Sequence, residues 1–266
     1  MIMAVMIAAI SRREYAESRP AATRVDIGAT LIHDRQHFII EGLPGDLAAR
    51  HSTGFDEFDR VLGGGLVPGS LVLVAGDPGV GKSTLLTGLA LWWVRRGLRV
   101  IYVAGEESPA QIRMRAERLG FSPDTEAGFH ILPEVQLESL MDTLNGEAGD
   151  RSTAGSTVII ADSVQTLHSE QIDSFPGSPT QIRYCGGVLA DFARRSGHPV
   201  FLVGHVTKSG DLAGPKLLEH MVDTVLYFEG SGGGAIRMVR AVKNRFGTTG
   251  ELAVREVRAE GPVPGD

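Results

Sequence analysis

The chain has 266 residues, of which 42% are hydrophobic and 22% charged, and its formal net charge is −6. These proportions exclude a chain that is disordered throughout or coated with positive charge, although they leave room for a local basic groove. The single cysteine, Cys185, excludes an internal disulfide framework and a multi-cysteine zinc site, and it fits a reducing compartment. No apolar run reaches the roughly 18 residues of a membrane-spanning helix, so we expect a cytoplasmic protein with no membrane partner.

The composition along the chain predicts three parts: an N-terminal extension over residues 1–50, an α/β domain over 51–258 and a flexible tail over 259–266. In the extension, residues 29–41 predict two short strands around a polar turn. We interpret His33 and His37 as turn residues, because two histidines without a third ligand are weak support for a metal. Arg12 and Arg13 follow the apolar start, whereas the charge of a secretory signal precedes it.

From Ser52 onward, short apolar runs alternate with helical patterns. Strands are predicted over residues 71–75, 100–104, 129–132, 157–161 and 199–204, and three more follow over 223–228, 236–243 and 251–258. Helices are predicted over residues 82–96, 109–119, 135–144, 179–195 and 215–221, two of them beginning after the cap residues Ser108 and Ser178. This order predicts an α/β fold with a mostly parallel sheet flanked by helices, ending in antiparallel strands.

The strongest motif is GDPGVGKST, which follows the first of these strands and opens a helix. It has the G-x-x-x-x-G-K-[ST] spacing of a phosphate-binding loop, in which glycines let backbone N–H groups and a helix N-terminus face an anion. We therefore predict an ATP site with Lys82 on the β- and γ-phosphates and Ser83 on Mg²⁺. The predicted nucleotide-binding residues are Gly76, Asp77, Pro78, Gly79, Val80, Gly81, Lys82, Ser83 and Thr84.

Carboxylates follow two other predicted strands. Asp162 ends a run of four apolar residues, and we expect it to hold Mg²⁺ directly or through water at the carboxyl edge of the sheet. Glu106 and Glu107 follow the strand after the glycine loop. Only one of two adjacent side chains can face the phosphates, and we favour Glu106 as the general base. The alternative is that neither glutamate is catalytic and that both are first-turn residues favoured by the helix dipole.

Several blocks in order make the chain resemble the RadA family of RecA-like DNA-repair ATPases. They are TGFDEFDRVLGGGLVPGSLVLVAGDPGVGKSTLL, YVAGEESPAQIRMRAERLG, ADSVQT, GHVTKSGDLAGPKLLEHMVDTVLYFEG and KNRFG, between residues 52 and 257. The resemblance implies a RecA-like core that couples ATP hydrolysis to branch migration or processing of recombination intermediates. The family's four-cysteine zinc module and Lon-protease-like domain are not found in these 266 residues, and we expect either a trimmed chain or a short paralogue.

The resemblance also implies roles for individual residues. His205 would sense the γ-phosphate, and Lys243 and Arg245 of KNRFG would reach the nucleotide of a neighbouring subunit, in a hexameric ring or filament. Arg115, or else Arg113, would stack on the adenine.

The expected partner is single-stranded or branched DNA, together with the RecA recombinase. Lys208 and Lys216 flank a glycine-containing loop that would touch the DNA backbone. Phe175 lies in a loop without lysine or arginine and would stack on a base. The alternatives are a KaiC-like signalling ATPase or autokinase, which would not explain KNRFG or LAGPK, and a nucleotide-gated assembly protein with negligible turnover.

Overall fold

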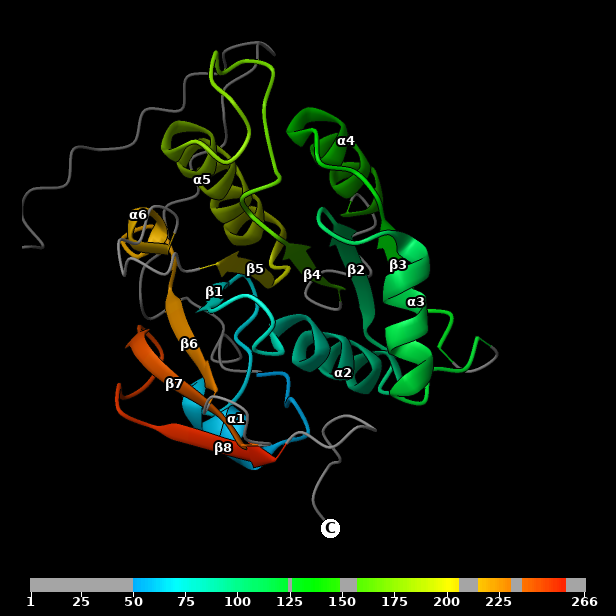
Figure 1. Ribbon diagram of the computed structural model, residues 1–266, viewed down its shortest axis with the longest axis vertical. Helices are drawn as coiled ribbons and strands as arrows, with labels where there is room; N and C mark the ends of the chain where they lie inside the picture. The colour runs from blue at the N-terminus through cyan, green and yellow to red at the C-terminus, as the bar shows by residue number, and fades with distance from the viewer. Residues whose placement is uncertain (1–49, 124–125, 149–156, 206–214, 231–235, 257–266) are drawn as a thin grey trace, which may run out of the picture. The chain divides into compact units, whose positions relative to one another are not determined.

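A computed structural model describes residues 50–123, 126–148, 157–205, 215–230 and 236–256 (Figure 1). Contacts divide the chain at residues 43 and 44, and everything described belongs to the second unit. The predicted strands of residues 29–41, the tail 259–266 and Lys208 lie outside the described residues. Within those ranges no helix is long and apolar enough to cross a membrane.

Eight strands form one sheet in the order β3-β2-β4-β5-β1-β6-β7-β8. The strands are β1 (Leu71–Gly76), β2 (Arg99–Ala104), β3 (Phe129–Leu132), β4 (Thr157–Asp162), β5 (Val200–His205), β6 (Thr224–Gly230), β7 (Ile236–Asn244) and β8 (Leu252–Glu256). The first six pair in parallel, whereas β7 and β8 are antiparallel. The predicted mixed sheet is therefore confirmed.

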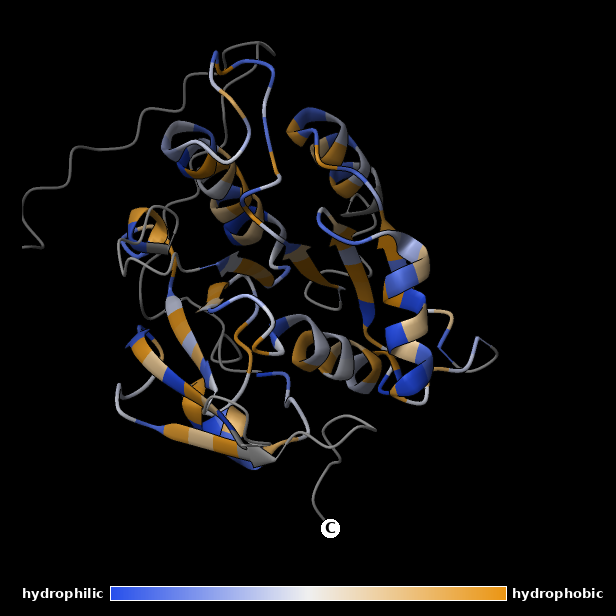
Figure 2. Cartoon of the chain, in the orientation of Figure 1, coloured by the Kyte–Doolittle hydropathy of each residue, from blue (hydrophilic) through white to orange (hydrophobic). Residues whose placement is uncertain are grey.

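The helices are α1 (Asp56–Val61), α2 (Lys82–Val94), α3 (Pro109–Arg118), α4 (Leu137–Ala148), α5 (Pro179–Ser196) and α6 (Pro215–Leu218). One apolar core joins α1, α2 and α3 to one face of the sheet, and a second joins α4, α5 and α6 to the other face. Successive strand residues point to opposite faces, so strands buried on both faces are mainly apolar, and orange predominates in the central strands of Figure 2.

Three of the predicted helices, α3, α4 and α5, begin at a side-chain cap. Ser108 accepts a hydrogen bond from Gln111 N in a capping box, and Ser178 accepts one from Gln181 N, as the sequence predicted. Helix α4 begins at Leu137 instead of residue 135, because the side chain of Gln136 accepts a hydrogen bond from Ser139 N and so caps the helix from outside.

Helix α1 was not predicted, and its local sequence explains why. It has six residues, too few for a periodic pattern, and its N-cap residue, Phe55, makes no side-chain cap. The turn before it is instead held by the Asp59 carboxylate, which accepts hydrogen bonds from Ser52 Oγ and from the backbone and hydroxyl of Thr53. Phe58 and Val61 then bury its inner face.

Parallel pairing places the carboxyl ends of β1, β2, β4 and β5 along one edge of the sheet. In this register Gly76 lies beside His205, and Ala104 lies beside Asp162. Residues from four separated segments of the chain therefore meet at this edge, where parallel sheets bind their ligands.

Candidate nucleotide site

The glycine loop connects β1 to α2 at this edge. Gly79 and Gly81 have φ angles of 76° and 107°, in the left-handed region that side chains disfavour. Gly76 is required for space, since a Cβ there would lie 2.3 Å from the carbonyl oxygen of Phe228. Helix α2 begins at Lys82 with no acidic residue in its first turn, so no carboxylate there opposes the attraction of the helix dipole for an anion.

Lys82 is nearly buried, with 3% of its surface exposed. Its Nζ donates hydrogen bonds to the carbonyl oxygens of Gly76 (2.8 Å) and Asp77 (2.9 Å) and lies 3.2 Å from His205 Nδ1. Burial lowers the pKa of Lys82, and the nearby charges of Asp162 and Glu106 oppose that shift. The ammonium is thus held at the loop and surrounded by the predicted catalytic carboxylates.

Glu106 is the glutamate that faces this lysine. His205 Nε2 lies 2.8 and 2.9 Å from its two carboxylate oxygens, and Ser163 Oγ donates a hydrogen bond to one of them. The hydrogen bond from His205 is the largest cause that lowers the pKa of Glu106, with burial acting against it. Lys82, His205 and Glu106 therefore form one continuous chain of polar contacts.

Glu107 points elsewhere and forms an ion pair with Arg115. The Arg115 side chain is buried, and its second terminal nitrogen, NH1, has no hydrogen-bond partner. The two glutamates thus have different partners, His205 for Glu106 and Arg115 for Glu107, which the sequence alone does not show. Whether Arg115 also stacks on an adenine stays a prediction.

Asp162 ends β4 and is 6% exposed. It continues the alternation of Val158 and Ile160, which pack in the core shared with α2, so it lies on the same face of the sheet as Lys82 and Ser83. One of its oxygens, Oδ2, accepts a hydrogen bond from Tyr102 OH at 2.5 Å.

The side-chain oxygens of Asp162 and Ser83 suit a magnesium ion that also binds a nucleotide. A carboxylate and a hydroxyl are oxygen ligands, and Mg²⁺ is commonly held by one or two carboxylates together with substrate phosphates. Within the described ranges, no group of three His, Cys, Asp or Glu side chains could hold a metal alone. Asp162 and Ser83 are therefore the residues of this chain that would hold it, together with a bound nucleotide and water.

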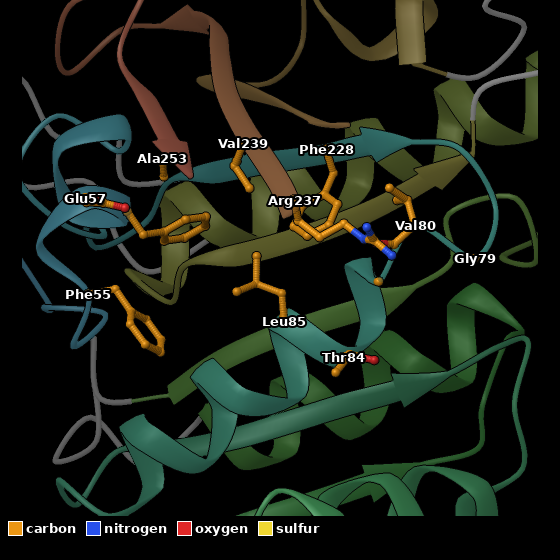
Figure 3. A pocket seen from close by; sticks show the side chains of 12 residues that line it. Phe55, Glu57, Gly79, Val80, Thr84, Leu85, Phe228, Arg237, Val239 and Ala253 are labelled. Carbon is orange, nitrogen blue, oxygen red and sulfur yellow. The ribbon is translucent and has the colours of Figure 1, made fainter. Parts of the chain in front are cut away.

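An apolar cavity opens beside the loop (Figure 3), and Arg115 lines a separate pocket with other residues of α3. Phe55, Phe58, Leu85, Phe228, Val239 and Ala253 supply its apolar walls, and Gly79, Val80, Gly81 and Thr84 form the end nearest the phosphate loop. Arg237 crosses one side and donates from Nε to the carbonyl oxygen of Val80 at 2.9 Å. The sequence predicted only the loop residues, because the other walls come from α1 and the residue before it, from Leu85 of α2 and from strands β6, β7 and β8.

Lys243 and Arg245 lie at the amino ends of the parallel strands, whereas the glycine loop lies at their carboxyl ends. Asn244 pairs with Thr224 and Thr224 with Val72, whereas the glycine loop begins at Gly76 beside Phe228. Lys243 Nζ donates to the carbonyl oxygens of Glu219 and Val222, and Arg245 pairs with Asp223 at 3.0 Å. Their printed partners are thus away from this chain's own loop, and their contact with the nucleotide of a neighbouring subunit stays a prediction.

The predicted DNA contacts are exposed where they are described. Phe175 is 87% exposed, in a loop whose carbonyl groups at Ser169, Ile172 and Ser174 lie within 3.0 Å of the side-chain amide of Gln181. Lys216 is exposed on α6. These placements are compatible with DNA contact but do not test it.

The loop, the buried lysine and the carboxylates on this sheet define a P-loop nucleotide-binding domain with a RecA-like fold. Residues 43–211 match the model of the AAA domain family, and the chain belongs to that family.

Comparison with curated relatives agrees with the resemblance found in the sequence. The chain is 46% identical over 212 residues to DNA repair protein RadA of Bacillus subtilis (strain 168), a match that covers 80% of this chain and 44% of that protein. It is 48% identical over 205 residues to that of Pseudomonas aeruginosa, covering 77% and 43%, and 48% identical over 200 residues to that of Mycobacterium tuberculosis (strain H37Rv), covering 75% and 40%. The predicted similarity to the RadA family is confirmed, and the match spans less than half the length of these relatives.

Proposed function

We propose that this domain hydrolyses ATP and that it does so in the service of DNA repair. The observation that carries the proposal is the contact chain from Lys82 through His205 to Glu106, beside the glycine loop and on the same face as Asp162. The similarity to proteins named DNA repair protein RadA supports the biological role. Branch migration, or other processing of recombination intermediates, is the finer form of this proposal.

Each residue of the site has its own role in the proposed hydrolysis of ATP. The loop amides and Lys82 bind the β- and γ-phosphates and offset their charge. Asp162 and Ser83 would hold Mg²⁺, whose positive charge would offset the negative charge that develops during phosphoryl transfer. Glu106 orients a water molecule and takes its proton, and its lowered pKa keeps it ionised at neutral pH. His205 connects this base to Lys82, so a γ-phosphate that draws Lys82 away would also change the contacts of Glu106.

The apolar cavity is our favoured site for the adenine. It adjoins Thr84 and Gly81, so a base placed there lies next to a triphosphate bound along the loop. Its apolar walls match the faces of a purine, and Arg237 offers a guanidinium beside it. The predicted contact with Arg115 would instead place the base in the separate pocket that Arg115 lines with Gln111 and Arg118. Substituting Val239 by tryptophan and Arg115 by alanine separates the two, because only the variant that alters the true site weakens adenine-nucleotide binding.

The position of Lys243 and Arg245 supports assembly into a ring or filament. They lie at the edge of the sheet away from this chain's own loop, where a second copy could receive them. Phe175, Lys208 and Lys216 are the proposed contacts to single-stranded or branched DNA. A protein with this role would work in the cytoplasm, with the RecA recombinase as a candidate partner.

The test is ATP hydrolysis with and without single-stranded DNA, for the parent chain and for Lys82→Ala, Glu106→Gln and Lys243→Ala. We expect DNA to stimulate the parent and each substitution to abolish that stimulation. Lys82→Ala should also lose nucleotide binding, whereas Glu106→Gln should keep it. Arg194→Ala is the matched control, because Arg194 is exposed and pairs with Asp191 on its own helix.

Other outcomes would identify a different function. Turnover that ignores DNA, or a self-phosphorylated product, would indicate a signalling ATPase or autokinase. Tight ATP binding without turnover would indicate a nucleotide-gated assembly protein. A parent chain that binds no magnesium–ATP would overturn the proposal altogether.

A further inference from the structure

Tyr102 is a buried polar side chain directly behind the proposed metal-binding carboxylate. It lies in β2, is 1% exposed, and donates its hydroxyl to Asp162 Oδ2 at 2.5 Å. The register of β2 and β4 explains the contact, since Tyr102 pairs with Ile160 and Ala104 pairs with Asp162. Tyr102 and Asp162 therefore lie on one face of adjacent strands, two positions apart along the sheet.

The hydroxyl is the only feature that distinguishes Tyr102 from a core phenylalanine. Its ring packs edge-on against Phe129, with the ring centroids 6.2 Å apart, and a phenylalanine would keep that packing. Burying a hydroxyl is unfavourable unless it makes a hydrogen bond, and here the partner is a carboxylate, which gives a short, charge-assisted bond. A carboxylate oxygen only accepts, so the phenol hydroxyl is the donor of this pair.

We propose that Tyr102 is a positioning residue that fixes the Asp162 carboxylate by holding Oδ2, so that the other oxygen is presented to a magnesium–nucleotide complex. The inference rests on the proposed ATP function. Residues that hydrogen-bond to metal ligands orient them, and their loss commonly costs about 10- to 100-fold in metal affinity or activity. In this arrangement Tyr102 contacts neither nucleotide nor metal and acts entirely through Asp162.

The test is the Mg²⁺ dependence of nucleotide binding in Tyr102→Phe, measured by titrating Mg²⁺ into the protein with a fluorescent ADP analogue. We expect the apparent Mg²⁺ affinity of the complex to fall about 10-fold, while binding of the analogue in EDTA stays at the parent value. Mn²⁺ binding followed by electron paramagnetic resonance should show the same loss. Tyr184→Phe is the matched control, because it removes a tyrosine hydroxyl that donates to Gln171 at 3.0 Å, and Tyr184 packs against the core on the other face of the sheet from Asp162.

A double-mutant cycle with Asp162→Asn separates positioning from general damage. If Tyr102 acts through Asp162, Tyr102→Phe has no further effect on Mg²⁺ affinity in the Asp162→Asn background. An unchanged Mg²⁺ affinity in Tyr102→Phe overturns the inference, and so does a loss that persists in full in the Asp162→Asn background. A parent chain that shows no Mg²⁺-dependent nucleotide binding contradicts the proposed function instead, and is recognised before any variant is compared.

Discussion

Replacing Gly105 by alanine should displace Glu106, the proposed catalytic base, although Gly105 itself is not among the proposed ligand contacts. Gly105 follows β2 and donates its N–H to the carbonyl oxygen of Asp162 at 2.8 Å. A Cβ at this position would lie 1.9 Å from Thr166 Oγ1, 2.9 Å from Thr166 Cβ and 3.2 Å from the carbonyl oxygen of Asp162. Either Thr166 or the segment that carries Glu106 must move.

The magnitude follows from that crowding. Overpacking a close-packed site costs about 1–3 kcal/mol, and we expect Gly105→Ala to lower the free energy of unfolding by about 2 kcal/mol. Turnover should fall further, because a displacement of about 1 Å in a catalytic group can cost roughly a hundredfold. Urea denaturation measures the first effect and ATP hydrolysis the second. Thr166→Ala in the same chain should restore part of both, since it removes the nearest atom but leaves the Cβ.

The control is Gly146→Ala in α4, where an added Cβ meets nothing within 4 Å. That change should be neutral or stabilising by up to about 1 kcal/mol, because alanine is the better helix former. A Gly105→Ala variant that matches the parent in both assays would contradict the predicted crowding, and so would a Thr166→Ala change that restores neither stability nor turnover.

Three further predictions concern the core and the ionisable groups. Trp93 is fully buried and donates Nε1 to Ser52 O at 2.9 Å, so Trp93→Ala should cost about 3–5 kcal/mol in urea denaturation; a cost below about 1 kcal/mol would contradict this packing. The hydrogen bond from His205 lowers the pKa of Glu106, so its carboxyl should titrate below 4.5 in the parent and higher in His205→Ala, as carbon NMR can measure; an unmoved titration would show that His205 is not the cause. Burial raises the pKa of the Cys185 thiol from 9.0 to about 12, so its contribution to stability is complete below pH 9 and is lost as the pH rises toward 12. Alkylation of the native protein at pH 8 should accordingly be no faster than unfolding.

Much of the fold followed from local patterns in the sequence. Strands buried on both faces are continuous apolar runs, and helices begin at serine caps, so β1, β4, α3 and α5 could be placed from short stretches alone. The glycine loop and Asp162 were found for the same reason, because each directly follows such a strand. Helix boundaries were less certain, since a single side-chain hydrogen bond, as at Gln136, moves the first residue of a helix.

Other parts of the site could not be found in this way because they are made by tertiary contacts. The apolar cavity brings Phe58 of α1 together with Val239 of β7 and Ala253 of β8, which are far apart in the chain. The choice between Glu106 and Glu107 depends on Arg115, which removes one of them from the site. Tyr102 reads as an ordinary core residue, and only its register against Asp162 shows what its hydroxyl does.

The central place of β1 determines when this domain can fold. It is the first strand among the described residues, yet its two neighbours in the sheet are β5 and β6, and Leu71 N donates to the Asp223 carboxylate across 152 positions. A ribosome must therefore release most of the domain before the strand that leads into the phosphate loop acquires either neighbour. Until then its apolar edges are open to other chains, so slow synthesis or truncation ahead of β6 should favour aggregation, whereas loss of β8 would spare this central pairing.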